Sequence, residues 1–273
     1  MPSQRLQPRA VERVWGRRDL PPGFPAAPDP DARLGEIWFE GPAGEAGLLV
    51  KHLFTADRLS VQVHPGDAEA RALGQQHGKD EAWYVLGAEP GAVIGLGLRK
   101  KVTRAELAEA ARDGSIEQLI DWRPVAAGDF FYSPGGTIHA LGGGLSLIEI
   151  QQNLDLTYRF WDYGRPRPLH VDEAVAVATP GPWSPCFEPV TLAPGRQVLA
   201  AGGRFVLERW TAGGHVRGDA VVVPTRSGGS IDGCKLEAGS AWSIRRGAAL
   251  AGRVDALIAY EGAEIRAAAR RAA

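Results

Sequence analysis

Polar side chains occupy every second position of the segment Leu59–Pro65 (LSVQVHP). Side chains on a β-strand alternate between its two faces, so Ser60, Gln62 and His64 are expected on one side and the apolar residues on the other. An amide oxygen and an imidazole that share a face can bind one metal ion. The alternative is a surface strand whose polar face lies in water, and this segment alone does not decide between the two.

Two later segments supply groups of the same kind. Glu81 stands directly before the strand-like stretch Ala82–Leu86, with Lys79 two residues earlier. His139 follows the turn Pro134–Gly136. Taken singly, the first two residues would be a solvated ion pair and the histidine a structural residue. Together, two imidazoles, a carboxylate and an amide oxygen suit a borderline ion such as zinc, with a position left open for water or substrate. The predicted ligands of one divalent ion are Gln62, His64, Glu81 and His139.

Further polar residues lie inside two more strand-like runs. Glu149 and Gln151 share one face of the first run, and Arg159 lies in an aromatic run over residues 157–162. A guanidinium that loses its water needs anionic or hydrogen-bonding partners, so Arg159 is a candidate active-site cation. The alternative is a surface arginine stacked on its aromatic neighbours. Arg165 follows closely and is predicted to help bind a phosphate group.

Gly and Pro occur at short intervals and most apolar runs are brief, which predicts many short strands joined by turns, as in a β-barrel or sandwich. The predicted strands are Gly47–Phe54, Leu59–Val63, Ala82–Leu86, Gly91–Leu96, Asp129–Ser133 and Ser146–Gln151. Helical spacing predicts helices over Asp67–Gln76, Thr103–Asp121 and His170–Ala178. The second of these helices begins with a capping box formed by Thr103 and Glu106.

The Pro-rich stretch Pro180–Pro189 marks the predicted boundary between two units. We predict a catalytic unit over residues 1–180 and a smaller all-β unit over residues 181–273.

Part of the first unit aligns loosely with part of the second, Ala127–Gly142 with Ala238–Gly252. The match indicates either an old duplication or a chance similarity of small residues. His139 matches Leu250 in this alignment, so a duplicated second barrel would lack this metal ligand.

Composition excludes several classes of protein. The 273 residues carry a formal net charge of −1, which gives no electrostatic reason to expect nucleic acid or an anionic membrane as a partner. The two cysteines, Cys186 and Cys234, form no CxxC pair, and residues 1–16 contain no apolar segment for secretion. No stretch approaches the roughly 20 apolar residues needed to cross a bilayer, and no nucleotide-binding or nucleophile-elbow motif is present. A cytoplasmic protein is predicted.

The candidate residues belong to a longer pattern that resembles the type I phosphomannose isomerases of the cupin superfamily, in their short bacterial form. The resemblance runs from about Arg13 to Ala178. It is carried by Val14–Gly16, Leu34–Trp38, Leu48–Lys51, Ser60–Pro65, Gly78–Tyr84, Pro134–Ala140 and Glu149–Asp162. The resemblance implies an all-β fold with a cupin-type β-barrel (jelly roll), a helical insertion near residues 103–121, and a second, smaller and degenerate cupin-like unit.

The resemblance also implies roles for individual residues. The four predicted metal ligands match those of the family, with zinc as the ion. Arg159 matches the family's active-site arginine, Lys79 a lysine two residues before the metal-binding glutamate, and Ser60 a serine two residues before the ligand glutamine. Arg165 stands where some relatives carry a phosphate-side lysine.

The implied reaction is the reversible isomerisation of mannose 6-phosphate and fructose 6-phosphate by proton transfer between C2 and C1. Arg159 would stabilise the developing negative oxygen, and the metal would act as a Lewis acid. Lys79, Glu149 or a metal-bound water would carry the proton. Some relatives carry a histidine base directly before the lysine, but this chain has Gly78 there and His77 one residue earlier. Three alternatives stay open: the same chemistry on another aldose, a non-catalytic sugar-binding cupin, and a barrel whose metal is purely structural.

Overall fold

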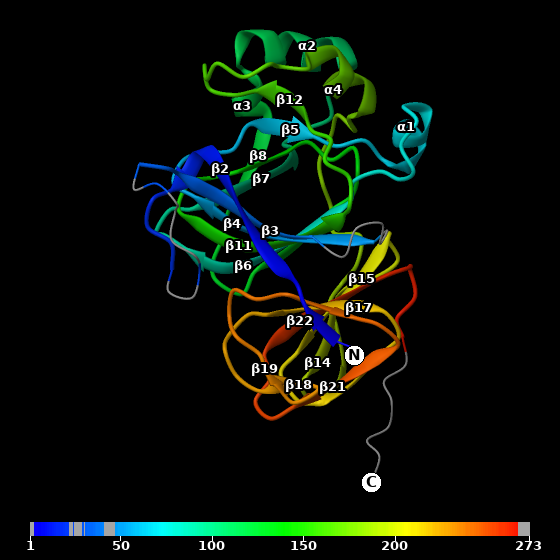
Figure 1. Cartoon of the computed structure of the whole chain (residues 1–273). Helices are drawn as coiled ribbons and strands as arrows, with labels where there is room; N and C mark the ends of the chain where they lie inside the picture. The colour runs from blue at the N-terminus through cyan, green and yellow to red at the C-terminus, as the bar shows by residue number, and fades with distance from the viewer. Residues whose placement is uncertain (1–2, 22–23, 25–28, 30, 41–46, 267–273) are drawn as a thin grey trace.

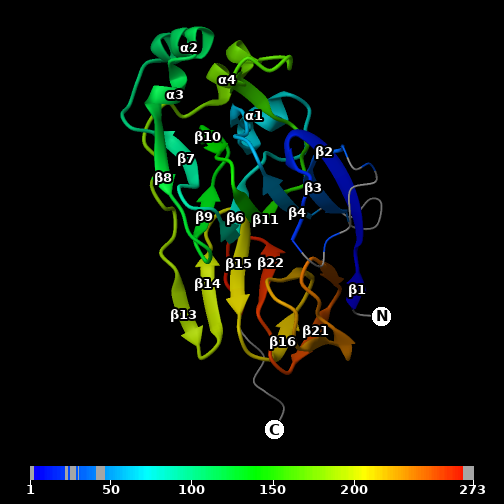
Figure 2. The same ribbon diagram turned by 90° about the vertical axis from the view of Figure 1, so that its left-hand side faces the viewer.

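The structure is a computed structural model and describes residues 3–21, 24, 29, 31–40 and 47–266. The parts of the two predicted units that fall at residues 1–2 and 267–273 lie outside this range. Within it, two β units are stacked, and helices cover the end of the first unit that faces away from the second (Figures 1 and 2). None of the described helices is long and apolar enough to cross a membrane.

Two facing antiparallel sheets form the first unit, and they confirm the predicted β-barrel. The six-stranded sheet contains, in spatial order, β2 (Gln7–Arg17), β3 (Leu34–Glu40), β4 (Leu48–Thr55), β11 (Leu145–Gln152), β6 (Glu81–Ala88) and β9 (Phe130–Ser133). The five-stranded sheet contains β12 (Tyr158–Trp161), β5 (Val61–Val63), β10 (His139–Leu141), β7 (Val93–Leu98) and β8 (Ile120–Pro124). A buried cluster that includes Trp83, Ile94 and Leu147 fills part of the space between the sheets.

Helices cover the outer face of the five-stranded sheet. The structure contains α1 (Asp67–Ala72), α2 (Arg104–Asp113), α3 (Ile116–Leu119) and α4 (Val171–Val177). Apolar residues of α2, α3 and α4 pack against the outward side chains of β5, such as Val61 and Val63. The capping box of Thr103 and Glu106 is confirmed.

The predicted helix over Thr103–Asp121 is wrong in its length. Gly114 adopts the left-handed conformation (φ 82°) that commonly ends a helix, so α2 stops at Asp113. After the short α3, the chain enters β8 at Ile120. The predicted helix over Asp67–Gln76 is also shorter than expected, since α1 ends at Ala72.

The second unit also consists of two antiparallel sheets. The seven-stranded sheet contains β1 (Ser3–Arg5), β20 (Trp242–Ile244), β17 (Ala220–Pro224), β22 (Ala256–Glu261), β15 (Phe205–Trp210), β14 (Arg196–Ala200) and β13 (Val190–Ala193). The four-stranded sheet contains β16 (Gly214–Arg217), β21 (Gly247–Ala251), β18 (Ser230–Ile231) and β19 (Cys234–Lys235). Because β1 pairs with β20, the start of the chain contributes a strand to the second unit (Figure 2). A division of the chain at residue 180 stays a prediction.

The two units share a buried apolar layer between the six-stranded and the seven-stranded sheet. Val50 and Phe54 of β4 face this layer, where Phe205 and Leu257 of the second unit also pack. Alternation along β4 therefore directs its even-numbered residues toward the second unit and its odd-numbered residues, including Lys51, into the first barrel.

Candidate active site

Strand register places three predicted site residues in one row across the five-stranded sheet. Gln62 on β5 pairs with His139 on β10 at one side and with Arg159 on β12 at the other. Side chains of directly opposed residues share a face, so all three point into the barrel while the neighbouring Val61 and Val63 point to the helices. The alternation predicted for this segment is confirmed from Ser60 to His64, and the chain positions His64 just past the end of β5. It is wrong for Leu59, which precedes β5 and packs between the two sheets with Trp83 and Ile94 instead of facing the helices.

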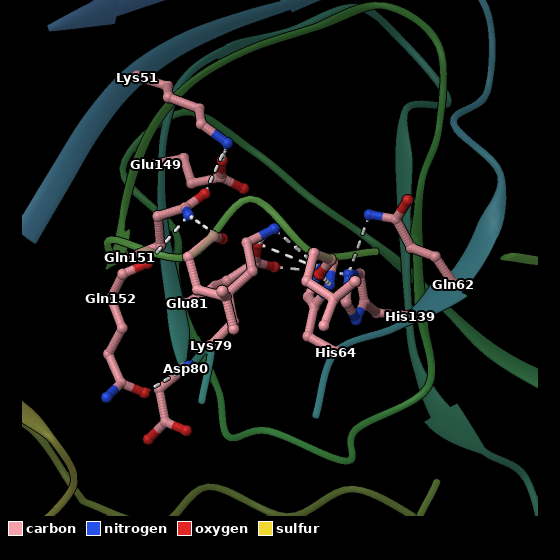
Figure 3. A network of polar contacts seen from close by, with 12 residues as sticks. Lys51, Gln62, His64, Lys79, Asp80, Glu81, His139, Glu149, Gln151 and Gln152 are labelled. Carbon is pink, nitrogen blue, oxygen red and sulfur yellow. Dashed lines mark hydrogen bonds and ion pairs between the residues drawn. The ribbon is translucent and has the colours of Figure 1, made fainter. Parts of the chain in front are cut away.

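Two imidazoles and a carboxylate meet on the inner side of the barrel (Figure 3). Glu81, the first residue of β6, lies with Oε1 3.2 Å from His64 Nε2 and with Oε2 3.4 Å from His139 Nε2. The possible ligand atoms of these three residues all lie within 4.8 Å of one another, and all three side chains are buried. A group of this composition and spacing could hold a metal ion.

Hydrogen bonds to the protein backbone orient both imidazoles. His64 Nδ1 donates to Leu156 O and His139 Nδ1 donates to Thr137 O, each over 2.9 Å. Each ring therefore presents the lone pair of Nε2 to the centre of the group, as a metal ligand requires. Burial lowers the pKa of His64 to about 3 and also lowers the pKa of His139, so both rings are neutral near pH 7.

Glu81 supplies the strongest indication that this group binds a cation. Burial alone would raise the pKa of this carboxyl, but His64 in its protonated form and the Lys79 ammonium hold it well below its ordinary value, so it is ionised. Near pH 7, where both imidazoles are neutral, Lys79 is its cationic neighbour. The Oε2 of Glu81 is buried and accepts no hydrogen bond from any described residue. A buried anionic oxygen without a donor is costly, and a metal ion would remove that cost. The residues present therefore fit a divalent ion.

Gln62 and Lys79 adjoin this group. The Gln62 amide nitrogen lies 3.2 Å from His139 Nε2, while its oxygen accepts a hydrogen bond from Ser60 Oγ over 3.1 Å. For its oxygen to face the group, the amide must turn over, and the hydroxyl of Ser60 can then accept instead of donate. Lys79 Nζ lies 2.6 Å from Glu81 Oε1 and 3.2 Å from His64 Nε2.

A second row of polar residues crosses the facing six-stranded sheet. Glu149 on β11 pairs with Lys51 on β4 and with Trp83 on β6. Its Oε2 lies 3.1 Å from Lys51 Nζ, and its Oε1 accepts from Trp83 Nε1 over 2.9 Å. Lys51 also donates to Gln151 Oε1 over 2.6 Å and lies 4.4 Å from the centre of the Trp38 ring.

These contacts set the charges of the pair. Burial and the charge of Glu81 raise the pKa of Glu149, and Lys51 only partly opposes them. Burial lowers the pKa of Lys51, but the carboxylates of Glu149, Glu36 and Glu81 outweigh it and raise the pKa overall. Both pKa values are therefore raised, for different reasons. Three carboxylates favour the charged form of Lys51, whereas burial and the negative charge of Glu81 disfavour the charged form of Glu149.

Lys51 is a site residue that the sequence interpretation does not include. The resemblance covers it only as the last residue of the segment Leu48–Lys51. A lysine inside a predicted strand whose other residues are apolar except for His52 is the available signal, because a buried lysine requires an anionic partner.

A cavity of about 380 Å³ lies between the two rows, within the range typical of small-molecule sites. Its lining includes Ser60, Gln62, Lys79, Glu81, Glu149 and Arg159. Arg159 Nε is buried and has no hydrogen-bond partner among the described residues. Burial is the main cause that lowers the pKa of this guanidinium, and the positive charge of nearby Arg167 lowers it further.

The structure brings together eight of the nine predicted site residues; the ninth, Arg165, does not line the cavity. Its guanidinium pairs with Asp162 at 3.1 Å and lies over the Tyr163 ring. Arg167 lines the cavity instead and is held by two hydrogen bonds to Asp162, of 2.6 and 2.7 Å.

Neither His77 nor Gly78 provides a proton-transfer group. His77 is absent from the cavity lining, and its Nδ1 lies 2.9 Å from Gly78 O. A Cβ at Gly78 would lie 2.5 Å from the carbonyl carbon of Gly66 and 2.7 Å from Pro65 O. The close packing of these loops leaves no space for a histidine at position 78.

A separate cavity of about 220 Å³ lies at the junction of the two units, where its lining includes Leu48, Asn153, Val221 and Ser243. None of the predicted site residues lines it. The convergence of ionisable groups therefore assigns the candidate active site to the cavity of the first barrel.

Comparison with known proteins identifies relatives of the chain. No protein-family model matches the chain. Mannose-6-phosphate isomerase from Streptococcus mutans is 38% identical over 184 residues, which are 62% of this chain and 56% of the relative. GmuF from Bacillus subtilis, described as a probable mannose-6-phosphate isomerase, is 34% identical over 214 residues, 64% of this chain and 67% of the relative. Across the curated relatives that it matches, the chain spans between half and two thirds of their length.

Solved structures show the same fold. The crystal structure of mannose 6-phosphate isomerase from Bacillus subtilis superimposes with a TM-score of 0.82 at 24% identity, covering 95% of this chain and 100% of that one. A variant of phosphomannose isomerase from Salmonella typhimurium gives 0.75 at 13% identity, covering 96% and 100%. At these identities the likeness establishes the cupin-type fold, and the sequence relatives establish the family. The chain belongs to the type I phosphomannose isomerases.

Proposed function

We propose that the chain is a metal-dependent aldose–ketose isomerase that interconverts mannose 6-phosphate and fructose 6-phosphate. One observation carries the proposal: the Glu81 carboxylate lies beside two neutral imidazoles, and its buried Oε2 has no hydrogen-bond donor among the described residues, at a cavity that Arg159 and Glu149 also line. An orphan anionic oxygen and an unpartnered guanidinium are costly in a packed interior, and a cation and an anionic substrate would satisfy both.

His64, Glu81, His139 and Gln62 are the proposed ligands, and zinc is the proposed ion because imidazole and carboxylate donors suit it. When bound, the ion would supply Lewis-acid polarisation of the sugar oxygens. The contacts of Ser60 with the Gln62 amide and of the backbone with both imidazoles would hold these donors in place.

The remaining chemistry is assigned to residues of the chain itself. Glu149 takes the proton from C2 and returns it to C1, and burial brings the pKa of its carboxyl closer to a working pH. The electron pair of the broken C2–H bond forms the C1=C2 double bond, and the C1 oxygen becomes negative. Arg159 stabilises that charge in a setting with little water. Lys79 exchanges the hydroxyl proton between O2 and O1.

The phosphate is assigned to Ser60 and to basic residues that follow β12. Ser60 and Arg165 are the predicted contacts, and we add Arg167 because it lines the cavity and Asp162 fixes its guanidinium. A planar guanidinium held in this way suits recognition of a phosphate. We also propose a cytoplasmic location, which the phosphorylated substrate and the two unpaired cysteines support.

The test is conversion of mannose 6-phosphate to fructose 6-phosphate by the purified chain as isolated, after chelation, and after zinc is restored. We expect turnover that the chelator removes and zinc returns, with His64→Ala inactive under all three conditions. Thermal unfolding of the chelated protein helps to separate a catalytic from a purely structural metal. A purely structural metal predicts a large loss of stability on chelation and no turnover by the metal-loaded protein.

No turnover by folded, zinc-loaded protein would contradict the proposal. Turnover of unphosphorylated mannose or of another aldose phosphate at a higher kcat/KM would transfer the same chemistry to that sugar. Sugar binding by calorimetry without turnover of any aldose would identify a binding protein.

A further inference from the structure

Asp80 lies between two proposed site residues but points away from them (Figure 3). Lys79 and Glu81 face the cavity, whereas the carboxylate of Asp80 accepts the Gly135 N–H over 2.8 Å and the Tyr132 hydroxyl over 2.7 Å. Its backbone N–H donates to Gln152 Oε1 over 2.9 Å, and its carbonyl accepts from Gln152 N over 3.0 Å. Four hydrogen bonds thus fix one residue whose side chain does not contact the cavity.

These bonds connect the segments that carry the proposed ligands. Gly135 belongs to the turn that precedes His139, and Gly136 N donates to His64 O over 2.7 Å. Lys79 N donates to Pro65 O over 3.0 Å. The chain segments before Glu81, before His139 and after His64 are therefore one hydrogen-bonded assembly, with Asp80 as a shared acceptor.

The second unit contacts this assembly directly. The hydroxyl of Tyr132 donates to Asp80 and accepts the backbone N–H of Arg204, which lies between β14 and β15, over 3.1 Å. The Tyr132 ring also packs on Phe205, with 5.2 Å between the ring centres. Gly203 lies so close that an added Cβ would be 2.3 Å from the Tyr132 oxygen.

A second connection runs through the side chain of Arg204. Its Nη1 lies 3.2 Å from Asp67 Oδ2, and the Oδ1 of Asp67 accepts the Gly78 N–H over 2.8 Å. The loop over residues 202–204 thus holds the segment 78–80 at two points, of which the Tyr132 connection is buried.

We propose that the loop 202–204 of the second unit positions the metal- and substrate-binding segment Lys79–Glu81, with Tyr132 and Asp80 as positioning residues. The kinetic part of this inference rests on the proposed isomerase function. Outer hydrogen bonds orient ligands, and their loss typically costs about 10–100-fold in metal affinity or activity. We expect an effect near the lower end, about 10-fold, because Tyr132 acts on Glu81 through the adjoining residue.

The test compares Tyr132→Phe with Tyr84→Phe. Both tyrosines lie in the apolar layer between the units and each substitution removes one hydroxyl, but Tyr84 faces Arg209 and does not contact Asp80. Each variant is loaded with cobalt(II), whose visible spectrum reports on ligand geometry, and cobalt affinity is measured by competition with a chelator. Kinetics with mannose 6-phosphate and thermal unfolding complete the comparison.

We expect Tyr132→Phe to bind cobalt about 10-fold more weakly, with an altered spectrum and a kcat about 10-fold lower at little-changed KM. Tyr84→Phe should match the unsubstituted chain in all of these. Gly203→Ala, which pushes on the Tyr132 oxygen from the second unit, should reproduce the cobalt result of Tyr132→Phe.

Unchanged cobalt affinity and spectrum in Tyr132→Phe would overturn the inference, as would equal changes in Tyr84→Phe. The cobalt measurements need no turnover. They therefore test this positioning role even if the zinc-loaded chain proves inactive on mannose 6-phosphate and the proposed function fails.

Discussion

The two β units share an architecture but differ in what occupies their interiors. Each consists of two facing antiparallel sheets. The first contains a cavity of about 380 Å³ lined by charged residues, whereas large side chains such as Trp210, Trp242 and Ile258 fill the second. A sheet pair of this kind can therefore either enclose a site or form an ordinary packed core, and the inward-facing residues determine which.

The segments that aligned loosely in the sequence show this difference at one position. The first segment is a strand, a turn that contains Gly136 (φ 88°) and a second strand. The second segment is a strand, a bend at residues 245–246 and a strand that begins at Gly247 (φ 114°). His139 then faces Glu81 in the first barrel, whereas Leu250 packs in the core of the second. An old duplication and a chance similarity both stay open as explanations of the match.

Each barrel also buries a glutamate, and the two differ in their hydrogen bonds. Glu208 of the second unit accepts four hydrogen bonds, two from Arg196 and one each from Trp210 and Tyr260. Glu81 of the first unit has an oxygen without a donor among the described residues. A buried charge that is satisfied within the chain stabilises the fold, and one left unsatisfied indicates where a ligand binds.

The largest expected effect on the free energy of unfolding tests whether Glu208 has a structural role. Glu208→Gln leaves the partly buried Arg196 guanidinium without its counter-charge, and because losing one partner of a fully buried ion pair costs about 3–5 kcal/mol, we expect a loss of about 2–3 kcal/mol here. Urea unfolding should show this loss in the free energy of unfolding, with metal affinity unchanged. Glu81→Gln should instead weaken zinc binding by more than about 100-fold, because loss of an outer partner alone costs about 10–100-fold. A loss of stability below about 1 kcal/mol in Glu208→Gln would contradict the distinction.

The next effect tests the unpartnered guanidinium of the first barrel. Arg159→Ala should lower kcat by about 10²–10³-fold, or about 2.7–4 kcal/mol, if Arg159 acts as a single oxyanion donor. Stability should change little, since Arg159 has no ion-pair partner among the described residues. Arg123→Ala is the control: it removes a guanidinium that pairs with Asp121 and does not line the cavity, and we expect kcat to stay unchanged. Equal kcat for Arg159→Ala and the unsubstituted chain would remove the proposed role.

Local rules predicted those parts of the site that lie on regular strands. The period of two along residues 59–65 placed Gln62 and His64 on the inner face, and register then brought His139 and Arg159 beside them. The capping box at Thr103 was equally local. The alternation and the capping box depend on neighbours a few residues away, so the local sequence contains the information they need. The register between β5, β10 and β12 joins distant segments and follows only from the folded sheet.

The misses occurred where the chain leaves regular structure or where packing comes from a distant segment. Tyr163 (φ 54°) and Gly164 (φ 75°) turn the chain after β12, so alternation no longer shows that Arg167, and not Arg165, reaches the cavity. Gly114 ended a helix whose apolar pattern continued. Lys51 became a site residue only through Glu149, about a hundred positions away.

The apolar layer between the two barrels contains a buried polar group of a third kind, which is neither satisfied nor placed at a cavity. Both ring nitrogens of His52 lack a partner among the described residues, and the ring packs among Phe24, Phe39 and Phe54. Burial lowers the pKa of His52 from 6.5 to about 3. The folded state therefore favours the neutral ring. Above pH 6.5 the ring is neutral in both the folded and the unfolded chain, and the free energy of unfolding decreases as the pH falls from 6.5 toward 3.

The smallest expected effect is the loss of stability that His52 causes as the pH falls. At pH 5 the unfolded chain protonates His52 and the folded chain does not, which costs about 2 kcal/mol at about 1.4 kcal/mol per pH unit. The advantage of His52→Leu over the unsubstituted chain should therefore grow by about 2 kcal/mol between pH 7.5 and pH 5 in urea unfolding. Comparing the two pH values removes the effect of side-chain volume, which does not depend on pH. His215→Leu, at an exposed position of the second unit, should show no such growth. A pH-independent difference for His52→Leu would mean that this imidazole has a partner in solution, and the layer between the barrels would then resemble the satisfied core of the second unit.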